Sequence, residues 1–287
     1  MTCWVGAAGP GGSAASVAGV VTMMHTGYDT GASHPVRTGP RDRSVAIDAS
    51  ITPRRGRRPR RRGYNGGMDA HKPVIVVGGH GRVALRLARI LSEHDGEVCS
   101  VIRNEAHSDD VREAGAHPLV ADVEQLDVDG LAELFEGAGA VVWAAGAGGG
   151  DPQRTYAVDR DAAIRSMDAA ARAGVTRYVM VSYDGAGPDH GVPEGDPFFP
   201  YAEAKAAADA HLRGSDLEWT VLAPGRLTDE PGRGTIGVGE GKREDRETSR
   251  DEVAAVACAV LHRPDTIGRT IDFSDGDTPI GEALSQR

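Results

Sequence analysis

The sequence predicts an α/β protein in which residues 68–287 form a single doubly wound parallel sheet with helices on both faces. Two observations predict this class. Short apolar runs, bounded by glycine or polar residues, alternate with segments in which apolar residues recur every three or four positions. The connections between these segments are short, so successive strand–helix units build one parallel sheet that helices cover on both sides.

The first expected strand is Pro73–Val77 (PVIVV), an apolar run that ends in glycines and has the composition of a strand buried on both faces. The first helix is expected at Arg82–His94, where the apolar residues have a helical period. Further strands are expected at 97–102, 117–121, 140–144, 177–182, 217–222 and 270–273, and further helices at 108–114, 126–135, 155–173, 201–212 and 251–261. The loop 185–199 and the segment 228–246 are expected to line a substrate pocket.

Residues 1–67 differ from the rest of the chain in charge and composition. They hold ten Arg, no Lys and three Asp, a net charge of +7, whereas residues 68–287 carry −17. Because they are rich in Gly, Ser, Pro and Arg and lack an apolar period, we expect a disordered leader, whose Arg run at 54–62 is a candidate nucleic-acid or membrane-surface tail. The alternative is that the leader is not translated, since Met68 stands just before the first strand. A signal peptide fits poorly, because no basic residue precedes the weakly apolar stretch 14–24.

Several classes of function are disfavoured by composition. The acidic charge of residues 68–287 repels a phosphate backbone, so nucleic acid is not expected as their partner. There is no apolar run long enough to span a membrane. Cys3, Cys99 and Cys258 have no metal-ligand spacing, so we expect reduced thiols and no metal site. We therefore expect a cytoplasmic protein, monomeric or homodimeric, that acts on a small molecule.

A glycine-rich turn follows the first strand, with the spacing Gly78-x-x-Gly81-x-x-Ala84. Glycine lets the backbone turn sharply and approach a pyrophosphate, which the N–H groups at the start of the next helix then bind. The position of the turn predicts a Rossmann-type dinucleotide site rather than a glycine turn without a ligand. The predicted cofactor contacts in this turn are Gly78, Gly79, His80, Gly81, Arg82 and Val83.

The ends of the next three strands supply further candidates. Arg103 ends strand two, where a basic residue favours the 2′-phosphate of NADP and an acid the 2′-hydroxyl of NAD, although Glu105 lies close by. We therefore favour NADP(H) over NAD(H). Asp122 and Val123 follow strand three and are expected near the adenine. Ala144, Ala145 and Gly146 end strand four and are small enough for a cofactor to pass closely.

A candidate catalytic group lies at strand five and in the next helix. Ser182 ends the strand, and Tyr201 and Lys205 are four residues apart on the helix, so they share a face. An ammonium beside a phenol favours the phenolate and lowers its pKa. Lys205 is one of three lysines in a chain that otherwise uses arginine. A tyrosine–lysine pair on a helix surface is the plain alternative.

These motifs resemble the short-chain dehydrogenase/reductase superfamily, and specifically its atypical NAD(P)H-binding group near the NmrA-like and epimerase-like proteins. The resemblance covers nearly all of 68–287. The segments that carry it are VVGGHGRVA (76–84), VIRN (101–104), AVVWAAGAG (140–148), VTRYVMVSYDGA (175–186), YAEAK (201–205) and LEWTVLAPGRLTDEP (217–231).

The resemblance implies that Ser182 and Tyr201 hold a substrate oxygen, that Tyr201 exchanges its proton, and that Lys205 tunes Tyr201 and binds the nicotinamide ribose. It also implies that Pro224 and Gly225 lie near the nicotinamide. Three positions depart from the family pattern: Ala84 replaces the third glycine, Asp159 replaces an Asn on the helix after strand four, and Ala223 replaces an Arg before the Pro-Gly pair.

Three functions are compatible with these residues. The favoured one is an NADP(H)-dependent oxidoreductase that acts on a small carbonyl, quinone or flavin. The alternatives are an NAD-dependent sugar epimerase or dehydratase, for which the chain after Lys205 is short, and a non-catalytic NAD(P)-sensing protein, which would not need the Tyr-x-x-x-Lys motif.

Overall fold

A computed structural model describes residues 72–286 except 95, 149 and 240–244, and these residues belong to one compact unit. The leader 1–67 and its predicted disorder lie outside the described residues. In chain order the elements are β1 (Val74–Val77), α1 (Arg82–Glu93), β2 (Val98–Ile102), η1 (Glu105–His107), α2 (Ser108–Glu113), β3 (His117–Val120), α3 (Val128–Leu134), β4 (Ala140–Trp143), α4 (Pro152–Thr155), η2 (Tyr156–Ala162), α5 (Ala163–Arg172), β5 (Arg177–Val181), α6 (Phe199–Arg213), β6 (Glu218–Pro224), β7 (Arg226–Thr228), β8 (Thr235–Val238), β9 (Glu247–Ser249), α7 (Arg250–Leu261), η4 (Pro264–Thr266), β10 (Arg269–Asp275), β11 (Thr278–Pro279) and α8 (Ile280–Ala283).

The main sheet has the strand order β11-β8-β10-β6-β5-β4-β1-β2-β3. The seven strands from β10 to β3 are parallel, which confirms the predicted doubly wound sheet. The chain moves outward in one direction from β1 to β3 and in the other from β4 onward, so the topological switch lies between β1 and β4. Ligands of such sheets bind beyond the carboxyl ends of the strands at this point.

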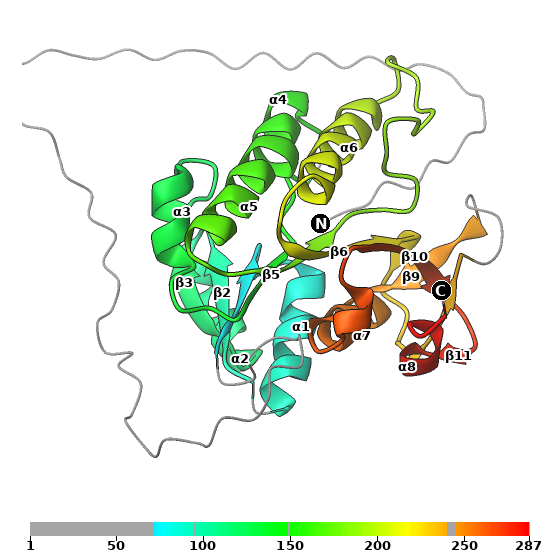
Figure 1. The fold of residues 1–287 in the computed structure, drawn as a ribbon, viewed down its shortest axis with the longest axis horizontal. Helices are drawn as coiled ribbons and strands as arrows, with labels where there is room; N and C mark the ends of the chain where they lie inside the picture. Colours follow the sequence, from blue (N-terminus) through cyan, green and yellow to red (C-terminus); the bar gives the residue numbers. More distant parts are fainter. Residues whose placement is uncertain (1–71, 95, 149, 240–244, 287) are drawn as a thin grey trace, which may run out of the picture. The chain divides into compact units, whose positions relative to one another are not determined.

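Helices cover both faces of the sheet (Figure 1), with α3, α5 and α6 on one side and α1 and α7 on the other. Alternate residues of β1 supply the two cores: Val74 and Val76 pack into the core that contains α1 and α7, and Ile75 and Val77 into the core that contains α3 and α5. This two-sided burial explains why β1 has a continuous apolar sequence rather than an alternating one.

The structure differs from the sequence prediction at several places, one of which is a small second sheet formed by the parallel strands β7 and β9. The helix expected at 155–173 begins earlier, at Pro152 after the capping residue Asp151, and its first part contains the π-helical segment η2. The C-terminal part of the main sheet also contains two strands that were not expected: β8 pairs antiparallel with β10, and β11 pairs antiparallel with β8. Part of the segment 228–246 therefore belongs to the sheet. Both edge strands of the sheet contain a proline, Pro118 in β3 and Pro279 in β11.

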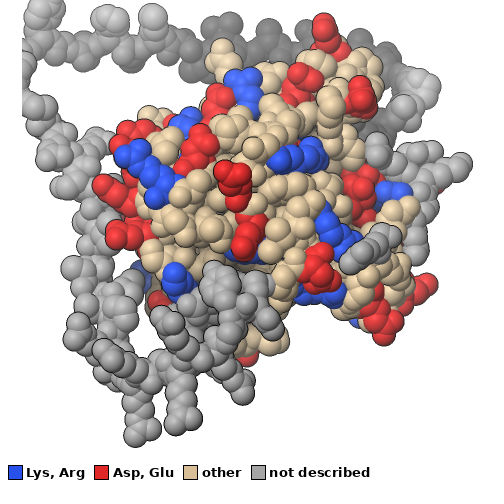
Figure 2. Space-filling model, viewed as in Figure 1, with Lys and Arg blue, Asp and Glu red and all other residues tan. Residues whose placement is uncertain are grey.

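The surface and the helices of the described residues bear on the classes of function considered above. On the face shown in Figure 2, acidic and basic side chains are interspersed rather than gathered into a basic patch. In the part of the chain that the structure describes, no helix is long and apolar enough to cross a membrane. The same residues contain no group of three or more His, Cys, Asp or Glu side chains arranged to hold a metal ion.

Candidate cofactor and active site

The glycine turn between β1 and α1 packs its backbone directly against neighbouring strands. Gly78 has φ +83°, and a Cβ added there would lie 2.6 Å from the Cα of Ala145. A Cβ at Gly79 would lie 2.5 Å from the Cβ of Ser100. The Gly81 N–H donates to the Gly78 carbonyl at 2.8 Å. A side chain at Gly78 or Gly79 would collide with these neighbours, so glycine is needed at both positions for the turn to form this closely packed cradle.

The start of α1 is open to an anion. Gly81 is its N-cap residue and supplies no side-chain cap, so the first N–H groups of the helix remain available to a ligand such as a pyrophosphate. The side chain of His80 turns to α2, where it contacts Asp110 at 2.7 Å and stacks on His107. Arg82 forms an ion pair with Asp229. Val83 packs against the core below, so the predicted contacts of this turn are mainly backbone groups.

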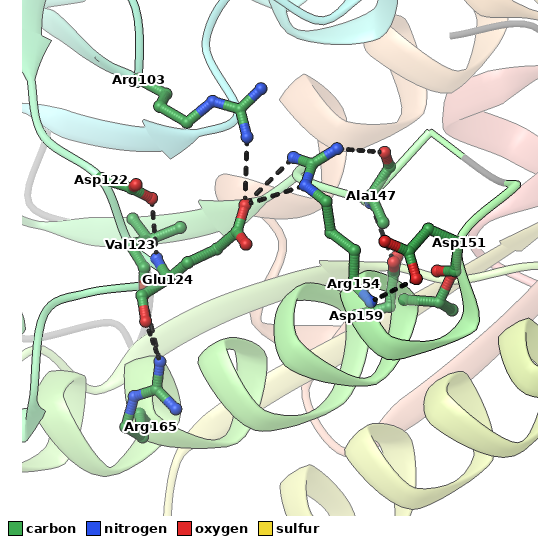
Figure 3. Close-up of polar contacts among 10 residues, drawn as sticks. Arg103, Asp122, Val123, Glu124, Ala147, Asp151, Arg154, Asp159 and Arg165 are labelled. Atoms are coloured by element: carbon green, nitrogen blue, oxygen red, sulfur yellow. Dashed lines mark hydrogen bonds and ion pairs between the residues drawn. The ribbon is translucent and has the colours of Figure 1, made fainter.

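The other predicted cofactor residues follow the strands next to the turn. Figure 3 shows Arg103, after β2, directed at Glu124, with an Nη1–Oε1 distance of 3.1 Å. Asp122, after β3, accepts a hydrogen bond from the Glu124 N–H at 3.1 Å, so its carboxylate is engaged in a local turn with Val123 between the two residues. Arg154, on α4, donates to the same Glu124 oxygen. Sequence reasoning missed Glu124 and Arg154, since neither belongs to a recognisable motif.

Small residues follow β4 beside the glycine turn. The Ala144 N–H donates to the Val77 carbonyl at 2.9 Å, and Ala145 forms the wall that a side chain at Gly78 would strike. Gly146 follows them. Their small size lets the glycine turn pack against the end of β4, and the passage of a cofactor beside them stays a prediction.

Ser182 is buried just after β5, and its hydroxyl donates to Asp209 Oδ2 at 2.6 Å. Asp209 lies on α6 four residues after Lys205, so the two share a helix face. Its side chain is fully buried, and its other oxygen, Oδ1, has no hydrogen-bond partner among the described residues. Burial raises the pKa of Asp209, while the charge of Lys205 and the hydrogen bond from Ser182 act to lower it. Sequence reasoning missed Asp209, although its spacing from Lys205 was a usable signal.

Lys205 is buried at the same strand end. Its Nζ donates to the Val181 carbonyl at 2.8 Å and to Met180 Sδ at 3.2 Å. Burial lowers the pKa of Lys205, because desolvation disfavours an ammonium, and the negative charges of Asp209 and Asp159 oppose this shift. The structure therefore brings Lys205 and Ser182 together around one carboxylate.

Asp159, where the resemblance implied an asparagine, is buried on η2. It accepts a hydrogen bond from the Ala147 N–H at 2.9 Å. Burial raises the pKa of Asp159, and the charge of Lys205 is the largest opposing influence. The carboxylate of Asp159 therefore interacts electrostatically with Lys205 and anchors the loop after β4.

Tyr201 lies in an aromatic cluster at the start of α6. Its ring centroid is 5.5 Å from that of Tyr183 and 5.2 Å from that of Phe198, and the side chain is half-buried. Pro224 is the last residue of β6 and Gly225 follows it, and the Pro224 carbonyl accepts a hydrogen bond from the Asp184 N–H at 2.9 Å. A Cβ at Gly225 would lie 2.5 Å from the carbonyl oxygen of Arg246.

All the candidate residues thus follow parallel strands or begin the next helix, so they gather at the carboxyl edge of one sheet. In strand order from β3 to β6 this edge carries the adenine candidates, Arg103, the glycine turn, the small residues after β4, Ser182 and the Pro-Gly pair. A ligand lying along the edge would have its adenosine half over β2 and β3 and its reactive half over β5 and β6.

Comparison with known proteins identifies the family of this chain. A family model described as "NAD(P)H-binding" matches residues 78–264. The chain is 34% identical over 215 residues to "Uncharacterized sugar epimerase YhfK" of Bacillus subtilis, a match that covers 74% of this chain and 99% of that protein.

Two solved structures are also similar. The "Putative NAD-dependent epimerase/dehydratase" from Bacillus halodurans is 32% identical with a TM-score of 0.69, covering 75% of this chain and 100% of that one. The oxidoreductase ylbE from Lactococcus lactis is 27% identical with a TM-score of 0.66, covering 74% and 95%. This chain belongs to the NAD(P)H-binding family of epimerase-like, atypical short-chain dehydrogenases/reductases.

Proposed function

We propose that this chain is an NADPH-dependent oxidoreductase that reduces a small carbonyl, quinone or flavin, with Tyr201 as the proton donor. One observation supports the proposal: Ser182 and Lys205 are both buried at the carboxyl end of β5, which only β4 separates from β1 and its glycine turn. Tyr201 precedes Lys205 by one helical turn, so the two share a face of α6. An apolar side chain would pack at this position better than a buried ammonium does, so packing alone does not explain a lysine here.

Each side chain has a defined task in this proposal. When bound, the nicotinamide supplies the hydride. The Tyr201 hydroxyl gives its proton to the substrate oxygen, and the Lys205 ammonium stabilises the phenolate left behind. Because Ser182 donates its own proton to Asp209, its oxygen offers lone pairs to the site, and it accepts a hydrogen bond from the alcohol that is formed.

The preference for NADP(H) rests on Arg103, whose side chain is 56% exposed after β2 and available to a ligand. Arg103→Ala should weaken NADPH binding by about 1–3 kcal/mol, the loss of one charged hydrogen-bonded contact, and leave NADH binding nearly unchanged. Fluorescence titrations of both cofactors test this. A wild-type chain that binds NADH more tightly than NADPH would contradict the assignment.

The test of the chemistry is NADPH consumption across a panel of carbonyls, quinones and flavins, with Tyr201→Phe as the key variant. Its turnover should fall by about 10²- to 10⁴-fold, the usual effect of losing a positioned acid, while NADPH binding is retained. Tyr156→Phe, which removes a hydroxyl from η2, is the control and should keep its activity. Full activity in Tyr201→Phe would rule out this proton donor.

The names of the relatives favour a second candidate, an epimerase or dehydratase of nucleotide sugars. Such an enzyme returns its cofactor to the starting state, so it would interconvert a sugar nucleotide without net consumption of NADPH. Analysis of nucleotide sugars after incubation with the chain separates the two functions.

A further inference from the structure

One glutamate holds two arginines together at the adenosine end of the site. Glu124 Oε1 accepts hydrogen bonds from Arg103 Nη1 at 3.1 Å, from Arg154 Nε at 3.2 Å and from Arg154 Nη2 at 3.0 Å (Figure 3). We call these three residues the Glu124 bridge. The glutamate side chain is 19% exposed, so these contacts are partly shielded from water.

The position of the Glu124 bridge is fixed from both sides. Arg154 Nη1 donates to the Ala147 carbonyl at 2.7 Å, in the loop after β4. Arg165, on α5, donates to the carbonyls of Val123 at 3.2 Å and Glu124 at 3.3 Å, which holds the backbone after β3. The bridge is therefore a built arrangement rather than a chance meeting of exposed side chains.

The bridge also crosses the cofactor's expected path. Glu124 follows β3 and Arg154 follows β4, and in the sheet β1 and β2 lie between those two strands. The contact between Glu124 and Arg154 therefore passes over the carboxyl ends of β1 and β2, where the glycine turn and Arg103 stand. The adenosine half of a dinucleotide binds over these strand ends in folds of this kind.

The charges of the Glu124 bridge favour an anion that carries more negative charge than a carboxylate. Two guanidinium groups face one carboxylate, which leaves the cluster with a net positive charge. A phosphate monoester carries a charge between about −1.5 and −2 at neutral pH and has three acceptor oxygens. Planar guanidinium groups bind such an anion through paired hydrogen bonds, so a 2′-phosphate would satisfy both arginines more fully than Glu124 does.

We propose that Glu124 is an internal competitor for the 2′-phosphate of NADP(H): it holds Arg103 and Arg154 in the cofactor-free protein, and the 2′-phosphate takes these two arginines from it. The inference rests on the proposed use of NADP(H). Arg154 becomes a second phosphate ligand, and Glu124 weakens NADP(H) binding both by competition and by repulsion at close range. A ligand with a free 2′-hydroxyl does not need to open the bridge, so Glu124 acts on the phosphorylated cofactor selectively.

Calorimetric titration of the full chain with 2′,5′-ADP and with 5′-AMP tests this without any substrate. Glu124→Gln should tighten 2′,5′-ADP binding by about 5- to 10-fold, the effect of removing one partly exposed opposing charge, and change 5′-AMP binding less than about twofold. Glu124→Ala should act in the same direction. Arg154→Gln should weaken 2′,5′-ADP selectively, and NADPH and NADH should follow the two nucleotides.

The matched control is Glu133→Gln, which removes the same charge from an exposed position on α3. An equal gain in Glu133→Gln would show a general charge effect and overturn the inference. Weaker 2′,5′-ADP binding in Glu124→Gln, or equal changes for the two nucleotides, would also overturn it. If the wild type binds 2′,5′-ADP more tightly than 5′-AMP but Glu124→Gln does not bind it more tightly still, only the proposed role of Glu124 is refuted. If the wild type binds 2′,5′-ADP no more tightly than 5′-AMP, both the role of Glu124 and the proposed dependence on NADP(H) are refuted.

Discussion

Replacing Gly78 by alanine should reveal how tightly the glycine turn is held against β4. The residue has φ +83°, which costs an L-amino acid about 1–2 kcal/mol. The new Cβ would also lie 2.6 Å from Ala145 Cα and 2.7 Å from its nitrogen, and these backbone atoms have no flexible end that can move aside. Crowding of this kind costs about 1–3 kcal/mol, so the total loss of unfolding free energy should be about 2–5 kcal/mol.

Gly174 is the matched control for the backbone part of this effect. It has φ +72°, but an added Cβ would meet nothing within 4 Å. Gly174→Ala should therefore lose about 1–2 kcal/mol, the cost of the backbone conformation alone. Urea unfolding followed by circular dichroism gives both values, and an NADPH titration should show at least a tenfold loss of affinity in Gly78→Ala only. Equal losses of stability in the two variants, with NADPH affinity unchanged, would refute the proposed cradle.

Four further predictions concern buried groups and the leader. Lys205→Met and Asp209→Asn should each lose about 3–5 kcal/mol of unfolding free energy, because each change leaves the other group buried without its opposite charge. The double variant should lose less than the sum of the two. Additive losses would show that the two groups do not interact. In Lys205→Met the free energy of unfolding should fall as pH rises above about 4. Burial holds the pKa of Asp209 above its ordinary 3.8, so the folded chain keeps a proton that the unfolded chain releases. A free energy of unfolding that does not change with pH in this range would contradict the prediction. Burial raises the pKa of Cys99 to about 11, so a thiol reagent near neutral pH should label it slowly in the folded chain and rapidly in urea. A chain beginning at Met68 should match the full chain in thermal stability and NADPH affinity, and a clear drop in either would show that the leader contributes to the fold.

The sequence was sufficient to predict those parts of the fold that a pattern of neighbouring residues determines. The apolar run of β1 and the glycines after it specify a buried strand and a sharp turn from neighbouring residues alone. The fold class followed because the same pattern recurs along the chain. Lys205 was identified because it stands four residues after Tyr201 on one helix face and because lysine is rare in this chain.

Contacts between distant residues could not be predicted in the same way. Glu124 and Arg154 are thirty residues apart and meet only because the strands before them end at the same sheet edge. The spacing of Asp209 from Lys205 placed both residues on one helix face, but only the fold brings that face to Ser182. The π-helical segment η2 and the strands β8 and β11 are short, so no period of apolar residues marked them.

The prolines in the two edge strands have a consequence for how the molecule associates. β3 has four residues and β11 two, and in each strand one residue lacks the N–H with which a neighbouring strand would pair. Short edges with missing donors are poor templates for strand addition, which protects the parallel sheet from edge-to-edge aggregation. A homodimer of this chain would therefore be expected to form through its helical faces and not by continuing the sheet from one copy into the next.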